Sequence, residues 1–258
     1  MERGMCALCL DERPLCSSHY IGKALYALSR TDGDSPILMS PNLIVQTDQQ
    51  IKSVRLCWDC EQLFSLRGEE YAMSMVDREG EFKLLNLLRS ATRCRPEGEY
   101  TAYFGSGLSV DCDSLAYFAL SVIWRGGHIW RSLSGRTTGG LQLGRFQEPL
   151  RQYLLGKTPH PQGVVVKITV ATDFASRNVV LFPRASESRR DTTVFNFVAR
   201  GLWFDIALGS DLPSYIRRCC CVNSPKKLIF GGDCERYVIN DCAGLMETAR
   251  VAKGLRTS

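Results

Sequence analysis

The spacing of hydrophobic positions predicts two amphipathic helices in the middle of the chain. Apolar residues between positions 111 and 125 recur at the i, i+3, i+4, i+7, i+8 spacing of one helix face: Leu115, Phe118, Ala119, Val122 and Ile123. We expect this wide stripe to face a core. Pro149 is best tolerated in the first turn of a helix, which predicts a second helix over 147–156. Its inward side chains would be Leu150, Tyr153 and Leu154.

The last third of the chain changes to the period of two that is typical of strands. In GVVVKITVATD (163–173) valine and isoleucine alternate with Lys167 and Thr169. NVVLF (178–182) predicts a second strand, and TTVFNFVARGLWFDIALG (192–209) predicts two more. We therefore expect a meander of antiparallel strands packed on the helices, which is an α+β arrangement without internal repeats.

The first third reads as a smaller unit. A short helix or turn is expected over 19–28, and NLIVQT (42–47) and IKSVRL (51–56) are expected to pair as two strands. Asp59 and Glu61 begin a predicted helix that runs to about Val76, where acidic groups suit the helix dipole. The expected division is an N-terminal module over 1–78 and an α+β domain over 79–258.

Composition places the chain among globular proteins. It has 258 residues, of which 45% are hydrophobic, and this is ample for a buried core. The longest apolar run, YFALSVIW (117–124), is far too short to span a bilayer. The first residues lack the basic-then-apolar layout of a secretory signal. We therefore expect a cytoplasmic protein with reduced thiols and no membrane partner.

Twelve cysteines are unusual in a reduced protein of this size, and their spacing indicates metal ligation. Cys6/Cys9 and Cys57/Cys60 are the two CxxC pairs. Two such knuckles can place four sulfurs tetrahedrally about 2.3 Å from one Zn(II). The sequence thus predicts a structural zinc site at these four residues, with buried free thiols as the alternative.

The other cysteines and histidines carry weaker signals. Cys16 and His19 form a CxxH pair, which is a third possible ligand pair but is less well spaced than the CxxC knuckles. The run Cys219–Cys221, with Cys234 and Cys242 downstream, has irregular spacing and favours free thiols over a second metal site. His128 is a possible phosphate contact, and His160, between two prolines, is expected in a solvent-exposed loop; a lone histidine with no partner in view is usually structural or idle.

One segment carries a net charge equal to that of the whole chain. Residues 125–157 hold six basic side chains and a single acid, Glu148, against a net charge of +5 for the whole chain. Arginines on a Gly-rich loop, with Trp124 and Trp130 interleaved, suit phosphate oxygens and exposed bases. The predicted nucleic-acid contacts are Arg125, Arg131, Arg136 and Arg145. A solvated basic loop explains the same composition.

The pattern CALC (6–9), LCSSH (15–19) and LCWDCE (56–61) resembles the HNH endonucleases, the ββα-metal nucleases, in their subgroup with a four-cysteine zinc. The resemblance covers roughly residues 6–75. It implies a zinc-bound ββα module, similar to a treble clef, in which His19 is the general base that activates water for attack on phosphate. It also implies a divalent cation, Mg(II) or Mn(II), beside that histidine.

The usual metal-binding positions of the family are occupied by other residues here. Ser18 stands where an acidic residue usually precedes the histidine, and Gly22 replaces a common proline. Lys52, Glu61 and Phe64 stand where the family commonly has asparagine or histidine. A divergent group with SHxxxK and LCxxCE patterns is more similar, through Ser18, His19, Lys23, Cys57, Cys60, Glu61 and Glu69. In that resemblance Glu61 helps to hold the catalytic cation.

Two functions therefore fit the sequence. The first is an HNH-like protein that binds or cleaves nucleic acid, with His19 and Glu61 as catalytic residues; bacterial or phage defence is a role that the family association implies. The second is a non-catalytic interaction protein in which the zinc module is a folding staple for a domain that binds a protein partner.

Overall fold

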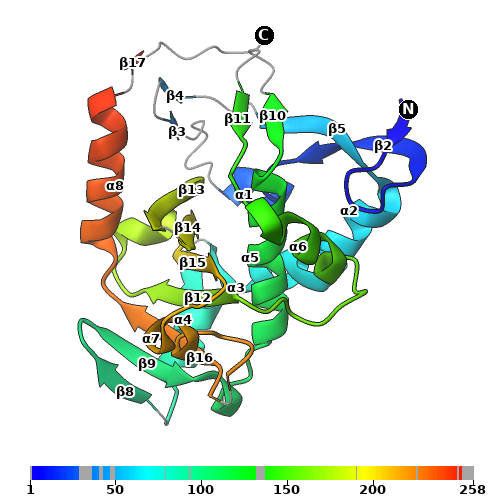
Figure 1. The fold of residues 1–258 in the computed structure, drawn as a ribbon. Helices are drawn as coiled ribbons and strands as arrows, with labels where there is room; N and C mark the ends of the chain where they lie inside the picture. The colour runs from blue at the N-terminus through cyan, green and yellow to red at the C-terminus, as the bar shows by residue number, and fades with distance from the viewer. Residues whose placement is uncertain are drawn as a thin grey trace.

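A seven-stranded sheet lies against a long central helix, as Figure 1 shows. The computed structural model describes residues 2–28, 37–40, 43–46, 50–78, 80–92, 94–131, 137–189, 191–224, 226–248 and 250–251. The sheet strands, in spatial order, are β13 (Val180–Arg189), β14 (Thr192–Ala199), β15 (Leu202–Gly209), β12 (Val164–Ala171), β16 (Leu228–Gly232), β9 (Tyr100–Phe104) and β8 (Cys94–Glu97). Neighbours are antiparallel except β12 and β16, which are parallel. The expected antiparallel strands are thus present, in a sheet with one parallel pair.

The central helix α5 (Cys112–Gly126) covers one face of this sheet. Asp111 caps its first turn by accepting a hydrogen bond from the Ser114 amide at 3.0 Å. Phe118 contacts Phe197 and Phe204 of the sheet edge-on, with ring centroids 5.9 and 5.7 Å apart. The predicted apolar stripe therefore faces the core. The second predicted helix is α6 (Gln147–Leu154), with Leu150 and Leu154 fully buried.

The Gly-rich segment between these helices is a hairpin in part, and not only a loop. Strands β10 (Ile129–Arg131) and β11 (Thr137–Gly139) pair antiparallel. Trp130 is fully buried against Tyr20, and its indole Nε1 donates to the carbonyl oxygen of Arg125 at 2.7 Å. The burial of this large aromatic ring holds the hairpin on the body of the protein and overrides the loop tendency of the glycines.

The N-terminal part contains a three-stranded sheet of β1 (Arg3–Met5), β2 (Glu12–His19) and β5 (Lys52–Cys57). The expected pairing of 42–47 with 51–56 is wrong. β5 pairs with β2, whereas β4 (Leu43–Gln46) pairs with β3 (Ile37–Ser40) and β17 (Arg250–Val251). Pairing with β2 places Cys57 opposite Leu15 and lets β5 bury Leu56. Local alternation does not specify such a partner.

Behind β5 the predicted helix runs without a break from Trp58 to Met75. It consists of α2 (Trp58–Phe64), a π-helical turn η1 (Ser65–Glu69) and α3 (Glu70–Met75). The remaining elements are α1 (Lys23–Leu28), β6 (Asp77–Arg78), β7 (Glu81–Phe82), α4 (Lys83–Arg89), η2 (Gly105–Gly107), η3 (Gly144–Phe146), η4 (Ala175–Asn178), α7 (Ser214–Arg218) and α8 (Glu235–Thr248). Among the described residues, no helix has the length and apolarity needed to cross a membrane.

The two parts of the chain share one hydrophobic core. A single cluster of buried residues reaches from Cys6 and Leu8 through α5 to Ile229. The two parts approach closely at Gly68 in the π-helical turn, where an added Cβ would lie 2.7 Å from the Phe118 backbone nitrogen. The predicted boundary near residue 78 therefore separates segments of sequence that are packed together in space.

Candidate metal centre and adjoining polar cluster

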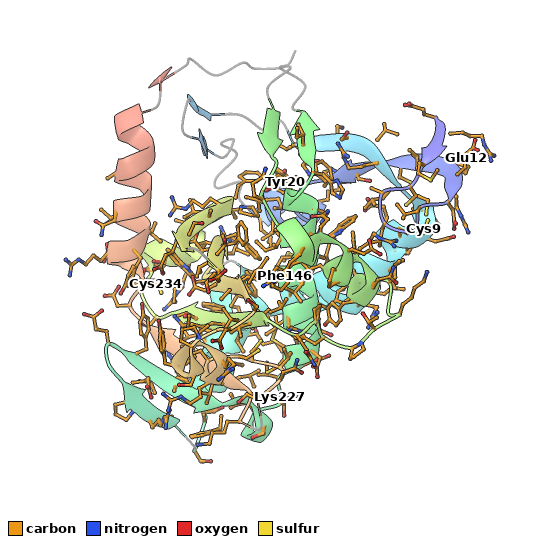
Figure 2. The ribbon with its side chains drawn as sticks, in the orientation of Figure 1. Cys9, Glu12, Tyr20, Phe146, Lys227 and Cys234 are labelled. Carbon is orange, nitrogen blue, oxygen red and sulfur yellow. The ribbon has the colours of Figure 1, made fainter. Side chains whose placement is uncertain are left out.

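Four thiols meet at the end of the β2–β5 sheet. The sulfurs of Cys6, Cys9, Cys57 and Cys60 all lie within 4.8 Å of one another, and the sulfurs of Cys9 and Cys57 are 3.9 Å apart. In a tetrahedral Zn(II) site with bonds of about 2.3 Å, adjacent sulfurs are about 3.8 Å apart. The four cysteines thus have the chemistry and spacing of a structural zinc site, as the CxxC pairs predict. Figure 2 places Cys9 on the N-terminal side of the molecule, far from Cys234 at the base of α8.

Backbone geometry explains how two distant segments bring these sulfurs together. In the first knuckle the Cys6 amide donates to Asp11 O and the Leu10 amide to Cys6 O, both at 2.9 Å. Leu10 closes this turn with φ of 64°, a conformation that leucine rarely adopts. In the second knuckle Cys57 ends β5 and precedes α2, and its amide donates to the Cys6 sulfur at 3.3 Å. Such N–H···S contacts favour a thiolate at Cys6.

The electrostatics of the cluster favour a bound cation. A hydrogen bond from the Cys60 thiol lowers the pKa of Cys6 to about 4, and the same interaction raises the pKa of Cys60. Burial raises the pKa of Cys9 to about 11. Four adjacent thiols cannot all ionise unless a metal ion offsets their mutual repulsion. A bound Zn(II) would supply that compensation, with ligation and thiol deprotonation coupled.

Other cysteines do not join this group. Cys16 is on β2 but lies outside the four-sulfur cluster, and Cys220, Cys221 and Cys234 are buried free thiols. Within the described side chains, which exclude Cys242, the four N-terminal cysteines form the one group with metal-ligand geometry. The expectation of free thiols after residue 218 is thus met for the residues that the structure describes.

His19 lies at the end of β2, half-buried. Its Nε2 is 2.7 Å from Oε1 of Gln50, and its ring centroid is 6.1 Å from that of Tyr26. Burial lowers the pKa of His19, and the positive charges of Lys52, Lys23 and Arg125 act in the same direction. The imidazole is therefore neutral at pH 7. Among the described residues its hydrogen-bond partner is an amide, and no carboxylate bonds to it.

Two carboxylates lie on the neighbouring helix, at Glu61 and Glu69. Oε1 of Glu61 is buried without a hydrogen-bond partner. Burial raises the pKa of Glu61, while hydrogen bonding to Ser18 and the charge of Arg125 lower it. Oε1 of Glu69 accepts from Nη2 of Arg125 at 2.5 Å. Glu61 is thus the carboxylate of this pair with a buried oxygen that has no hydrogen-bond partner.

The π-helical turn explains why both carboxylates interact with Arg125. Two turns of an α-helix span about 7.2 residues. The side chains of residues eight apart would therefore point in different directions around the helix axis, by most of the rotation that one residue adds. A turn with i→i+5 bonding takes up about one extra residue. Eight residues then make roughly two full turns, and Glu61 and Glu69 lie on one face of the helix, toward α5.

The predicted nucleic-acid arginines have different surroundings. Arg125 is 1% exposed, so the expectation that it contacts phosphate from a surface loop is wrong. It belongs to the buried end of α5, because it continues the Phe118–Val122 face one turn further on. The side chain of Arg131 and the whole of Arg136 lie outside the described residues.

Arg145 is exposed and its guanidinium lies 5.2 Å from the ring centroid of Phe146. It lines a cleft of about 220 Å³. The other lining residues are Gln142, Leu143, Gly144, Phe146, Asp191, Thr192, Thr193 and Leu208. Figure 2 shows Phe146 near the middle of the molecule. Asp191 faces the same cleft, so the lining carries both signs of charge.

Sequence reasoning missed three contributions to this region. Gln50, the partner of His19, has no sequence signal. Arg125 was noted for its charge alone, although its place on the apolar stripe of α5 could have indicated burial. Arg151 from α6 was likewise missed: its Nη1 donates to Leu8 O in the first knuckle at 2.6 Å.

No protein-family model, curated protein or solved structure matches this chain. The resemblance to the HNH endonucleases therefore stays a prediction from the sequence pattern, and the site is interpreted through its own geometry.

Proposed function

We propose that this chain is a zinc-stabilised, HNH-like protein that acts on nucleic acid and cleaves phosphodiester bonds, with His19 as the general base. The observation that carries the proposal is the arrangement of His19. A neutral, hydrogen-bonded imidazole stands at the end of a strand whose partner strand and following helix supply two zinc cysteines and two carboxylates.

The hydrogen bond of His19 gives the imidazole a defined basic nitrogen. Oε1 of Gln50 is an acceptor only, so Nε2 of His19 carries the proton and donates it. Nδ1 then keeps its lone pair and can take a proton from water. Because burial and three nearby cations lower the pKa of His19, this base stays unprotonated through neutral pH.

A divalent cation, Mg(II) or Mn(II), would supply charge stabilisation at the leaving oxygen when bound. Glu61 fits as a ligand for such an ion, because its buried Oε1 has no other partner and carboxylate oxygen suits hard cations. Glu69 fits less well, since the Arg125 guanidinium already neutralises it. Of the four predicted nucleic-acid arginines, Arg145 is the one whose described side chain is exposed, and it lines a cleft.

The setting of this activity is proposed from the resemblance and from the free thiols. We propose a cytoplasmic protein, because the described cysteines are unpaired and a zinc site of four thiolates needs a reducing compartment. A role in bacterial defence follows from the family association alone.

The alternative is a non-catalytic interaction protein in which the zinc module is a folding staple, that is, it only stabilises the fold. The Arg125–Glu69 ion pair favours it, because this pair is satisfied inside the protein and links the module to α5. In that case His19 would only pack against Gln50 and Tyr26, and the protein surface would bind a protein partner.

A plasmid assay separates the two functions. Purified protein is incubated with supercoiled DNA and Mg(II) or Mn(II), next to the His19→Ala and His160→Ala variants. His160 is the matched control, because it is a partly buried histidine that bonds to Val164 O, away from the cluster. The proposal expects nicking by wild type and by His160→Ala, and none by His19→Ala. Nicking that survives in His19→Ala, or no nicking with either ion, would support the staple.

A further inference from the structure

We propose that Arg125 is a positioning residue, which ties the His19 end of β2 to the π-helical turn that carries Glu69, and that it does so without touching nucleic acid. Its effect on cleavage rests on the function proposed above. Its effect on His19 can be measured whether or not the protein is a nuclease.

All three guanidinium nitrogens of Arg125 are used inside the protein. Nη2 donates to Glu69 Oε1 at 2.5 Å and Nη1 donates to the His19 carbonyl oxygen at 3.1 Å. Nε donates to Ser121 O at 3.3 Å, which fixes the side chain to its own helix. The guanidinium also lies 5.1 Å from the ring centroid of Phe64. With its side chain 2% exposed, Arg125 has no face left for a phosphate.

The contact with His19 lies where β2 ends. The last β2–β5 pair in the register is His19 with Lys52. Past that point the chain turns toward α1, and the carbonyl oxygen of His19 is held by Arg125. Loss of this bond would free the end of the strand and leave a buried carbonyl without its donor.

The contact with Glu69 holds the opposite side. Oε2 of Glu69 faces Gly22, where an added Cβ would lie 3.2 Å from that oxygen. The turn after His19 therefore packs directly on the Glu69 carboxylate, and the same carboxylate is held by Arg125. One guanidinium thus fixes both sides of the His19–Gly22 segment.

Only an arginine can make this connection. Its planar fork presents two parallel donors to two acceptors, whereas a lysine ammonium is a point charge on a flexible stem. Arg125→Lys therefore keeps the positive charge beside His19 but removes the bridge. This makes it the informative variant, because an altered His19 would report geometry and not a change of charge.

The activity-independent test is NMR titration of the three histidines in protein labelled at the imidazole carbons. In Arg125→Lys we expect the pKa of His19 to rise toward its ordinary value, because the freed strand end exposes the ring. The other charged neighbours of His19, Lys52 and Lys23, are unchanged, as are Gln50 and Tyr26. His160 is the internal control.

Arg200→Lys is the matched variant, since Arg200 is also buried and its Nε donates to Asp77 O elsewhere in the fold. An upward shift of His19 in Arg125→Lys but not in Arg200→Lys supports the proposal. An unchanged His19 titration in Arg125→Lys overturns it. If Arg125→Lys does not fold, Glu69→Gln, which keeps the side-chain size, is used in its place. The NMR titration of His19 in that variant is then judged in the same way.

The second readout is cleavage kinetics with DNA-binding measurements. A positioning role predicts that kcat of Arg125→Lys falls by about 10²-fold, as misplacement by about 1 Å can cause, while the Kd for DNA is unchanged. If Arg125 were instead a phosphate ligand, Arg125→Lys would raise the Kd for DNA, and this result would overturn the proposal. If wild type cleaves nothing, the nuclease proposal fails by itself, and the His19 titration still decides the role of Arg125.

Discussion

The zinc site offers the sharpest test of the structure through the variant Cys9→Ser. Cys9 is the partly exposed member of the cluster, so its replacement removes a ligand with little loss of packing. The metal would connect the two knuckles, in which Cys6 and Cys57 are 51 positions apart in the sequence. In the chain-entropy model, a cross-link that closes a loop of this length stabilises the fold by about 4 kcal/mol.

The expected change in Tm follows from this stabilisation free energy. For a protein of this size about 1 kcal/mol corresponds to roughly 2–4 °C in Tm, so Cys9→Ser in chelator should melt roughly 8–16 °C below wild type. Zinc content is measured by elemental analysis after dialysis against EDTA, and Tm by circular dichroism. We expect one zinc per wild-type chain and a large deficit in the variant.

Cys16→Ser is the control for this experiment. Cys16 is also partly exposed and free, and it lies on β2 outside the sulfur cluster. It should keep its zinc and melt close to wild type. If Cys9→Ser and Cys16→Ser bind equal zinc and melt together, or if fresh wild-type protein carries less than one zinc, the assignment of the cluster is wrong.

Three further predictions follow from the backbone and from one titrating group. Leu10→Gly should raise stability by about 1 kcal/mol in urea unfolding, because glycine adopts the left-handed φ of 64° without the cost that leucine incurs; no gain would mean that the turn is not strained. Gly68→Ala should lower stability by roughly 1–3 kcal/mol in the same assay, because its Cβ would meet the Phe118 backbone at 2.7 Å. Gly107→Ala, with open space around the new methyl group, should be close to neutral. Burial lowers the pKa of His128 from 6.5 to about 4, so the unfolded chain binds more protons between these values. Stability is therefore full above about pH 6.5 and falls on the order of 2–3 kcal/mol as the pH drops toward 4. The midpoint of His128→Gln should depend less on pH in this window, and parallel curves for the two proteins would contradict the assignment.

Local patterns predicted the elements whose residues interact with near neighbours. The 3.6-residue stripe at 115–123 gave the position of α5, and the period of two at 163–173 and 192–209 gave three strands of the sheet. The two CxxC pairs predicted the metal cluster, because four thiols that bind one ion must lie close together whatever path the chain takes between them.

Partners that are distant in sequence were decided only by the tertiary structure. β5 pairs with β2 and not with the neighbouring 42–47 segment, and local alternation does not specify that partner. The bond between Arg125 and the His19 carbonyl joins residues 106 positions apart, and the one between Gln50 and His19 spans 31. No periodicity encodes such contacts.

The sequence by itself thus determined the thiol ligands, the main helix and the strands, since each depends on spacing along the chain. The tertiary structure decided what Arg125 does: composition placed it in a basic loop, and packing buried it between β2 and the π-helical turn. The physical reason is that desolvation and hydrogen bonding set the role of a charge, and both depend on neighbours that only the folded chain brings together.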